Sequence, residues 1–93
     1  MDKNRPVYEK RIGNIRVAIW ENVSDGKTAD APKNIWHNVT IVRRYKDNGG
    51  GWKEISSYNG LGDLSQVGTA VWLAQEWLRK RQDELQTQDD GAE

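Results

Sequence analysis

The chain contains no cysteine and a single histidine, His37, among its 93 residues. Without cysteine there is neither a disulfide framework nor a thiolate nucleophile, and one histidine is too few for a histidine-based metal site or a catalytic triad. The aspartates Asp25, Asp30, Asp47 and Asp63 fall in segments expected to form loops or helix caps, where aspartate serves the turn geometry. The sequence therefore predicts a protein that is not an enzyme and holds no metal or cofactor.

Long apolar runs are also missing. The N-terminal residues MDKNRPVYEK lack the apolar core of a signal peptide, and no stretch approaches the roughly 18 apolar residues that a membrane span needs. We therefore expect a cytoplasmic protein that does not enter a membrane. A chain of this length buries only about 60% of its unfolded surface, which favours one small domain without a deep cleft.

The zero net charge conceals an uneven distribution of charge along the chain. Residues 1–81 hold all 14 basic residues and nine of the 14 acidic ones, which gives this part a net charge of +5. Residues 82–93 are acidic and contain few apolar side chains, so they are expected to form a disordered tail after a domain that spans residues 1–81. A basic domain suits an anionic partner, and the tail either competes for the same surface or only aids solubility.

Alternation of apolar and polar residues predicts β-strands over residues 10–22, 35–46 and 52–58. Gly13 interrupts the first of these, so the preceding residues 7–12 either belong to it or form a separate short strand behind a Gly-Asn turn. Residues 23–34 have turn-forming residues without an apolar period and predict a mobile surface loop. The glycines at 49–51 predict a hairpin turn between the last two strands.

Each predicted strand has two faces. The core face of the first strand carries Ile15, Val17 and Ile19, and that of the second carries Ile35, Val39, Ile41 and Tyr45. His37 shares this face, which favours a histidine at the edge of the core over a ligand. In the third strand Trp52 and Tyr58 are placed on the core side because they have the area to cover a helix, although the opposite register stays open.

A long helix is predicted after the strands. Asp63 is the expected N-cap, and Gln66 three residues later completes a capping-box pattern. The apolar residues that follow at helical spacing are Leu64, Val67, Ala70, Val71, Leu73, Ala74, Trp77 and Leu78. This stripe is wide enough for one flank to cover the sheet and the other to contact a second subunit, so we expect a homodimer through the helix. The cations at 79–81 are expected in the last turn, where they either complement the helix dipole or contact phosphates.

These elements predict an α+β fold, an antiparallel sheet of three or four strands followed by one C-terminal helix packed on one face. The uncovered face would then carry the candidate nucleic-acid-binding residues Arg16, Trp20, Trp36, Asn38, Arg44, Lys46 and Lys53. Bases stack on tryptophan rings while Lys and Arg neutralise phosphates, so the pattern predicts binding of single-stranded DNA or RNA with little sequence preference. Alternatively, the same tryptophans are hot spots for a protein partner of an adaptor module from a phage or mobile element.

An antiparallel curved sheet followed by a long helix that dimerises resembles the Whirly and transcriptional positive-cofactor-four superfamily. The resemblance covers residues 7–81 and concerns topology, and it implies four strands per subunit and binding of single-stranded DNA across the sheet. In sequence, the stretches 15–22, 36–40, 43–47 and 52–53 are most similar to short bacterial and phage-associated proteins of unassigned activity. That second resemblance implies no function.

Overall fold

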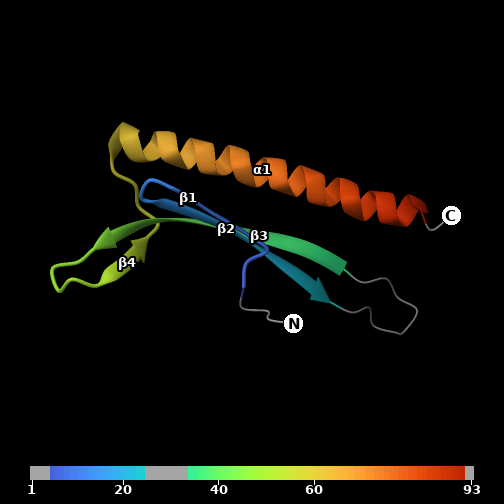
Figure 1. Cartoon of the computed structure of the whole chain (residues 1–93), viewed down its shortest axis with the longest axis horizontal. Helices are drawn as coiled ribbons and strands as arrows, with labels where there is room; N and C mark the ends of the chain where they lie inside the picture. The colour runs from blue at the N-terminus through green and yellow to red at the C-terminus, as the bar shows by residue number, and fades with distance from the viewer. Residues whose placement is uncertain (1–4, 25–33, 92–93) are drawn as a thin grey trace.

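The computed structural model describes residues 5–24 and 34–91. Within them the chain forms one antiparallel sheet in the order β1-β2-β3-β4, followed by a single helix. The elements are β1 (Tyr8–Ile12), β2 (Ile15–Ser24), β3 (Asn34–Lys46), β4 (Trp52–Ile55) and α1 (Gly60–Gly91). Figure 1 shows α1 running along one side of the sheet, and no other element of the described residues covers the opposite side. The predicted α+β fold is confirmed.

The segment before Gly13 is a separate strand, β1, so the alternative left open by the sequence is settled. β1 turns into β2 at Gly13 and Asn14, and Ile12 pairs with Ile15 across the turn. Gly13 has a φ of 60°, and a Cβ at this position would lie 2.4 Å from Nε2 of Gln66 in α1. Glycine is required here because an L side chain is strained at this φ and would push the Gln66 side chain aside.

The core lies between β2 and α1. Ile15, Val17 and Ile19 have no exposed surface, and they pack against Ala70 and Ala74 of the helix. β-Branched residues suit a pleated surface, and the two alanines allow the helix backbone to approach it closely. The core face predicted for the first strand is therefore correct. In the second strand the predicted set lies on the covered side, but only Ile41 packs against the core, and Val39 is exposed.

The turn between β3 and β4 sets the register of the last strand. The Asp47 carboxylate accepts hydrogen bonds from the backbone N–H groups of Gly49 and Gly51, at 3.0 and 2.9 Å. Residues 47–51 thus form the turn, and Lys46 pairs with Trp52. Trp52 therefore lies on the uncovered side, and the prediction that placed it in the core is wrong. Neither face of β4 is distinctly apolar, so hydrophobicity could not choose between the two registers.

Tyr58 lies on the core side, unlike Trp52, because it follows the end of β4 and is not bound by the register of that strand. Its ring packs beside the core, and its hydroxyl donates a hydrogen bond of 2.5 Å to the carbonyl oxygen of Ile41. The predicted position of Tyr58 is correct, but the expected strand over 52–58 ends at Ile55. The aromatic pair that the sequence placed together is divided between the two sides of the sheet.

The helix is longer at both ends than the sequence predicts. It begins at Gly60, and Asp63 lies in the first turn, where its carboxylate accepts a 2.7 Å hydrogen bond from the N–H of Asn59. At the other end it continues to Gly91, so residues 82–91 are helical and the prediction of a disordered tail is wrong for them. Residues 82–90 contain no Gly or Pro, and Arg81 Nη1 lies 3.4 Å from Glu84 one turn later, both of which favour helix.

The longer helix changes the role of the cations at 79–81. They lie well inside α1, whose last turn has no basic residue, so the predicted contact with the C-terminal dipole is wrong. Both ends of the loop expected at 23–34 belong to strands, because β2 reaches Ser24 and β3 begins at Asn34. Residues 25–33 lie outside the described residues. Among those that are described, no helix has the length and apolar character to cross a membrane.

Candidate functional site

The sheet has a covered face, on which α1 packs, and an open face on the other side. The strand registers bring three of the five tryptophans to the open face. Its side chains are Glu9 and Arg11 of β1; Arg16, Ala18, Trp20 and Asn22 of β2; Trp36, Asn38, Thr40, Val42, Arg44 and Lys46 of β3; and Trp52 and Glu54 of β4. Six of the seven residues predicted for the site are among them.

Trp52 forms a cation–π cluster with two neighbours from β3. The guanidinium carbon of Arg44 lies 5.1 Å from the centroid of the indole ring, and the ammonium nitrogen of Lys46 lies 6.0 Å from it. The tryptophan remains 60% exposed, so much of its ring is accessible to a ligand. Trp52 was not among the predicted site residues, because the sequence-based prediction placed it on the core side. The signal that could have identified it is the Asp-Asn-Gly-Gly-Gly turn, because a turn of these five residues puts Lys46 opposite Trp52.

The other two tryptophans lie at the far end of the open face. Trp36 is 43% exposed and pairs with Asn22, whereas Trp20 is half-buried and pairs with Asn38. Trp36 and Arg44 are eight residues apart on the same strand, which corresponds to about 26 Å at the usual rise per residue. The open face therefore presents two aromatic ends separated by a polar middle.

Arg16 occupies this middle and is engaged by two carboxylates. It forms an ion pair with Glu9 of β1, and its Nη1 lies 3.5 Å from Oε2 of Glu54 in β4. A shallow depression of about 610 Å³ is lined by Glu9, Lys10, Arg11, Arg16, Arg44 and Glu54. Since the carboxylates offset much of the charge of Arg16, the positive charge offered to a ligand is concentrated at Arg44 and Lys46. Arg11 is not among the residues predicted for the site, and it adds an exposed cation at the edge of this depression.

Lys53 is the one predicted site residue that lies elsewhere. It pairs with Tyr45, so its side chain projects on the side of the sheet opposite to Trp52. Its ammonium nitrogen lies 3.5 Å from Oδ2 of Asp47 in the turn. Lys53 is therefore removed from the candidate site, for the same reason of register that adds Trp52 to it.

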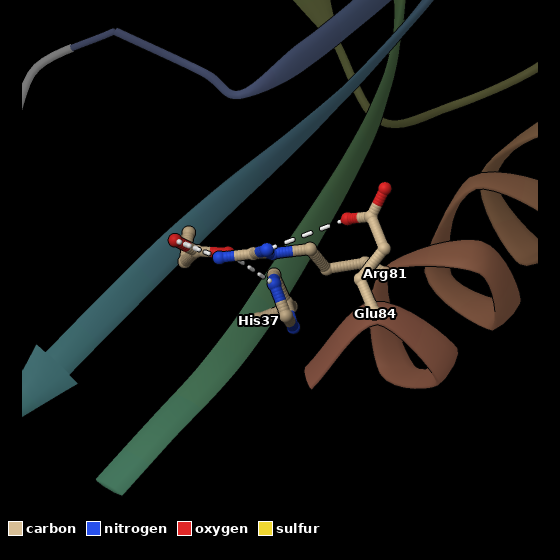
Figure 2. Close-up of polar contacts among 4 residues, drawn as sticks. His37, Arg81 and Glu84 are labelled. Carbon is tan, nitrogen blue, oxygen red and sulfur yellow. Dashed lines mark hydrogen bonds and ion pairs between the residues drawn. The ribbon is translucent and has the colours of Figure 1, made fainter. Parts of the chain in front are cut away.

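A second polar cluster lies on the covered face, where α1 meets the ends of β2 and β3. Glu21 accepts hydrogen bonds from Arg81, with Nε at 2.8 Å and Nη2 at 3.2 Å, and its Oε1 is 3.0 Å from Nε2 of His37 (Figure 2). The His37 ring also contacts Trp77 edge-on, with centroids 5.7 Å apart. Placement of His37 at the edge of the core is as predicted. The cluster fastens the helix to the sheet beyond the end of the apolar core.

The ion pair changes the acidity of both partners. The hydrogen bonds from Arg81 hold the pKa of Glu21 below its ordinary value of 4.5, although partial burial acts in the opposite direction. The same contact raises the pKa of Arg81 above its ordinary value. A carboxyl whose pKa is depressed by folding stabilises the folded state at pH values above its unfolded pKa, and this contribution disappears as the pH falls through the folded pKa.

We therefore expect the protein to lose stability on the acid side of pH 4.5 in part through Glu21. Thermal unfolding should show a smaller decrease in melting temperature between about pH 7 and pH 3 for Glu21→Gln than for the unchanged protein, because the variant has no carboxyl to protonate. Glu84→Gln is the matched control, since Glu84 contacts the same arginine from an exposed position. An equal decrease for Glu21→Gln and the unchanged protein would contradict this role.

Within the described residues, no three His, Asp or Glu side chains gather in an arrangement that would hold a metal ion. Comparisons with protein-family profiles, with curated proteins and with solved structures find no match to this chain.

Proposed function

We propose that this protein binds single-stranded nucleic acid across the open face, with bases stacked on Trp36 and Trp52 and with phosphates near Arg44 and Lys46. The observation that carries the proposal is the cluster at Trp52, where an exposed indole ring lies beside two cations. Stacking surfaces next to positive charge are what proteins use to hold a single strand. The order of four strands and one helix, which the resemblance to the Whirly and positive-cofactor-four superfamily implies, also supports it.

A single strand fits this face better than a duplex does. The bases of a duplex are already stacked on one another, so no base is available to stack on an exposed indole ring. The strand would extend from Trp36 past the ion-paired Arg16 to Trp52 and its two cations. Stacking accepts any base and phosphate contacts read no sequence, so little sequence preference is expected.

Two lysines on opposite sides of the same hairpin give a matched test. We expect labelled oligo(dT) to bind and its affinity to fall as salt rises, because the bound phosphates release counterions. Lys46→Ala should reduce the slope of log affinity against log salt by about 0.7, the effect of one phosphate contact on a single strand. Lys53→Ala should leave the slope unchanged, because Lys53 is directed to the other side.

Comparison of Lys46→Ala with Lys53→Ala separates the loss of a phosphate contact from the general effect of removing one positive charge. Both variants remove one positive charge from neighbouring strands, so equal slopes for the two would show that the open face is not the phosphate-binding surface. A labelled duplex of the same length is the second arm of the titration and should bind more weakly. Tighter binding of the duplex would contradict the proposal.

A protein-interaction module is the second candidate, and the ion pairs of Arg16 with Glu9 and Glu54 favour it. They reduce the free positive charge in the middle of the face and leave Trp36 and Trp52 exposed on either side. Exposed tryptophans are frequent hot spots of protein interfaces. In this case the partner would be a protein, as in an adaptor of a phage or mobile element, and its binding would depend little on salt, in contrast to phosphate binding.

The proposal includes a homodimer formed through α1. The side of the helix that faces away from the sheet exposes Leu61, Leu64, Val71 and Trp72, with exposed fractions from 39% to 81%. Gly68 lies among them, and a Cβ at this position would meet nothing within 4 Å. A stripe of large apolar side chains around a small residue allows close approach of a second helix.

A further inference from the structure

The part of the sheet that protrudes past β4 has an edge with no neighbour among the described residues. β4 pairs with the last four residues of β3, Arg43 to Lys46, so residues 34–42 have β2 on one side and, within residues 5–24 and 34–91, no strand on the other. Figure 1 shows this difference in length, with the short β4 beside one end of the long β3.

The backbone groups on that edge are identified by the pairing of β3. The N–H of Arg44 donates to Asn14 on the β2 side, at 2.8 Å, so the even-numbered residues of β3 direct their backbone groups toward β2. The odd-numbered residues point the other way, as the hydrogen bond from Tyr58 to the carbonyl of Ile41 illustrates. Within the described chain, the N–H and C=O groups of Ile35, His37 and Val39 therefore have no backbone partner on the open edge.

This edge also lacks the residues that normally protect an edge strand. Residues 34–42 read Asn-Ile-Trp-His-Asn-Val-Thr-Ile-Val, without Lys, Arg, Asp, Glu, Pro or Gly. By contrast, the other two edge strands are charged, since β1 reads Tyr-Glu-Lys-Arg-Ile and β4 reads Trp-Lys-Glu-Ile. Edge strands of soluble proteins are usually kept from pairing by such charges or by proline. An edge strand without charged residues or proline is suited to pair with another strand.

Apolar side chains are exposed on both sides of the same ribbon. Val39 is 40% exposed on the covered face, and Trp36 is 43% exposed on the open face. A strand added at the edge of β3 would cover these side chains in addition to satisfying the backbone groups.

We infer that the occupant of this edge is β3 of a second copy of the chain, so that two sheets join edge to edge into one antiparallel sheet. The partner strand must itself have a free, uncharged edge, and each copy supplies such a strand at the same concentration. Antiparallel pairing about a two-fold axis matches the free groups of Ile35, His37 and Val39 with the same groups of the partner. The two open faces then form one continuous surface with the Trp36 end of each copy at its centre.

The inference does not depend on nucleic-acid binding, and its test uses no nucleic acid. Val39→Pro removes one outward N–H and no hydrogen bond to β2, which makes proline tolerable at this position in a single copy. We expect light scattering to show half the molecular mass of the unchanged protein for Val39→Pro, at equal concentration. Val39→Lys, which places a protecting charge on the edge, should act in the same way if the proline variant does not fold. Thr40→Lys, which adds the same charge to the open face, should keep the full mass.

Hydrogen exchange separates a second copy from another part of the same chain. The amides of Ile35, His37 and Val39 should exchange more slowly as the protein concentration rises, because pairing between copies follows mass action. Trp72→Glu should leave this protection in place, since the helix contact uses another surface. Unchanged mass in both Val39 variants, or protection that does not vary with concentration, would overturn the inference.

Discussion

Replacing Trp36 and Trp52 together by alanine is expected to weaken the binding of single-stranded oligo(dT) by roughly 30-fold or more. Loss of one stacked base from an aromatic side chain costs about 1 to 3 kcal/mol, and each 1.4 kcal/mol is tenfold in affinity. Both rings lie on the open face with much of their surface exposed, at 43% and 60%. Fluorescence anisotropy of a labelled oligonucleotide is the measurement, because its signal does not depend on the tryptophans that are removed.

The two substitutions should act independently. Trp36 and Trp52 lie near opposite ends of β3 and share no contact, and sites this far apart usually add their effects within a few tenths of a kcal/mol. Each single variant is therefore expected to lose about half of the binding free energy that the double variant loses. A short oligonucleotide that spans only one ring should respond mainly to Trp52→Ala, because Arg44 and Lys46 lie beside that ring.

Trp72 provides the matched control for this experiment. It is 58% exposed, nearly the same as Trp52, but it lies on the outer side of α1, away from the open face. Each chain carries its own open face, so Trp72→Ala should bind the oligonucleotide with the affinity per chain of the unchanged protein, even where the proposed contact between α1 helices is weakened. If Trp72→Ala and the double variant weaken binding equally, the effect comes from the loss of any exposed tryptophan, and the open face is not the binding site.

The sequence predicts the first two long strands well because their apolar residues separate cleanly by face. Ile15, Val17 and Ile19 alternate with Arg16 and Trp20, so a period of two identifies which side is buried. The structure buries this set completely. The side chains assigned to the open face of β2 and β3 follow from the same period, which explains why six of the seven predicted residues lie together.

The prediction of which face is buried fails in β4, where the sequence pattern favours neither face. In β4 the order Trp-Lys-Glu-Ile places one apolar and one charged residue on each face, so register depends on the turn before it. One wrong register moved Trp52 out of the site and Lys53 into it. The predicted end of the helix is wrong for a different reason. The acidic composition of residues 82–90 was interpreted as disorder, although these residues also suit a helix.

Contacts between distant parts of the chain were not predictable. Arg81 and Glu21 are 60 residues apart, and their ion pair depends on the direction in which α1 crosses the sheet. Sequence spacing gives no information on this angle. The free edge of β3 likewise emerges only when the lengths of β3 and β4 are compared in the sheet.

Substitution of Val17 by alanine is expected to reduce the free energy of unfolding by about 2 to 3 kcal/mol, since it deletes buried methyl groups and leaves a cavity. The effect is large for this protein because the fully buried apolar layer consists of few side chains on β2 and α1. Small domains are stable by only about 5 to 15 kcal/mol, so this is a substantial part of the total. Urea unfolding followed by circular dichroism measures it.

Val23→Ala is the matched control, because it makes the same chemical change on the same strand and the same face. Val23 is 51% exposed whereas Val17 has no exposed surface, so the control should lose less than about 1 kcal/mol. The difference between the two variants isolates burial under α1 from the intrinsic preference of valine for a strand. Equal losses would show that α1 does not cover Val17 in solution. The open and covered faces on which the binding proposal rests would then have to be assigned again.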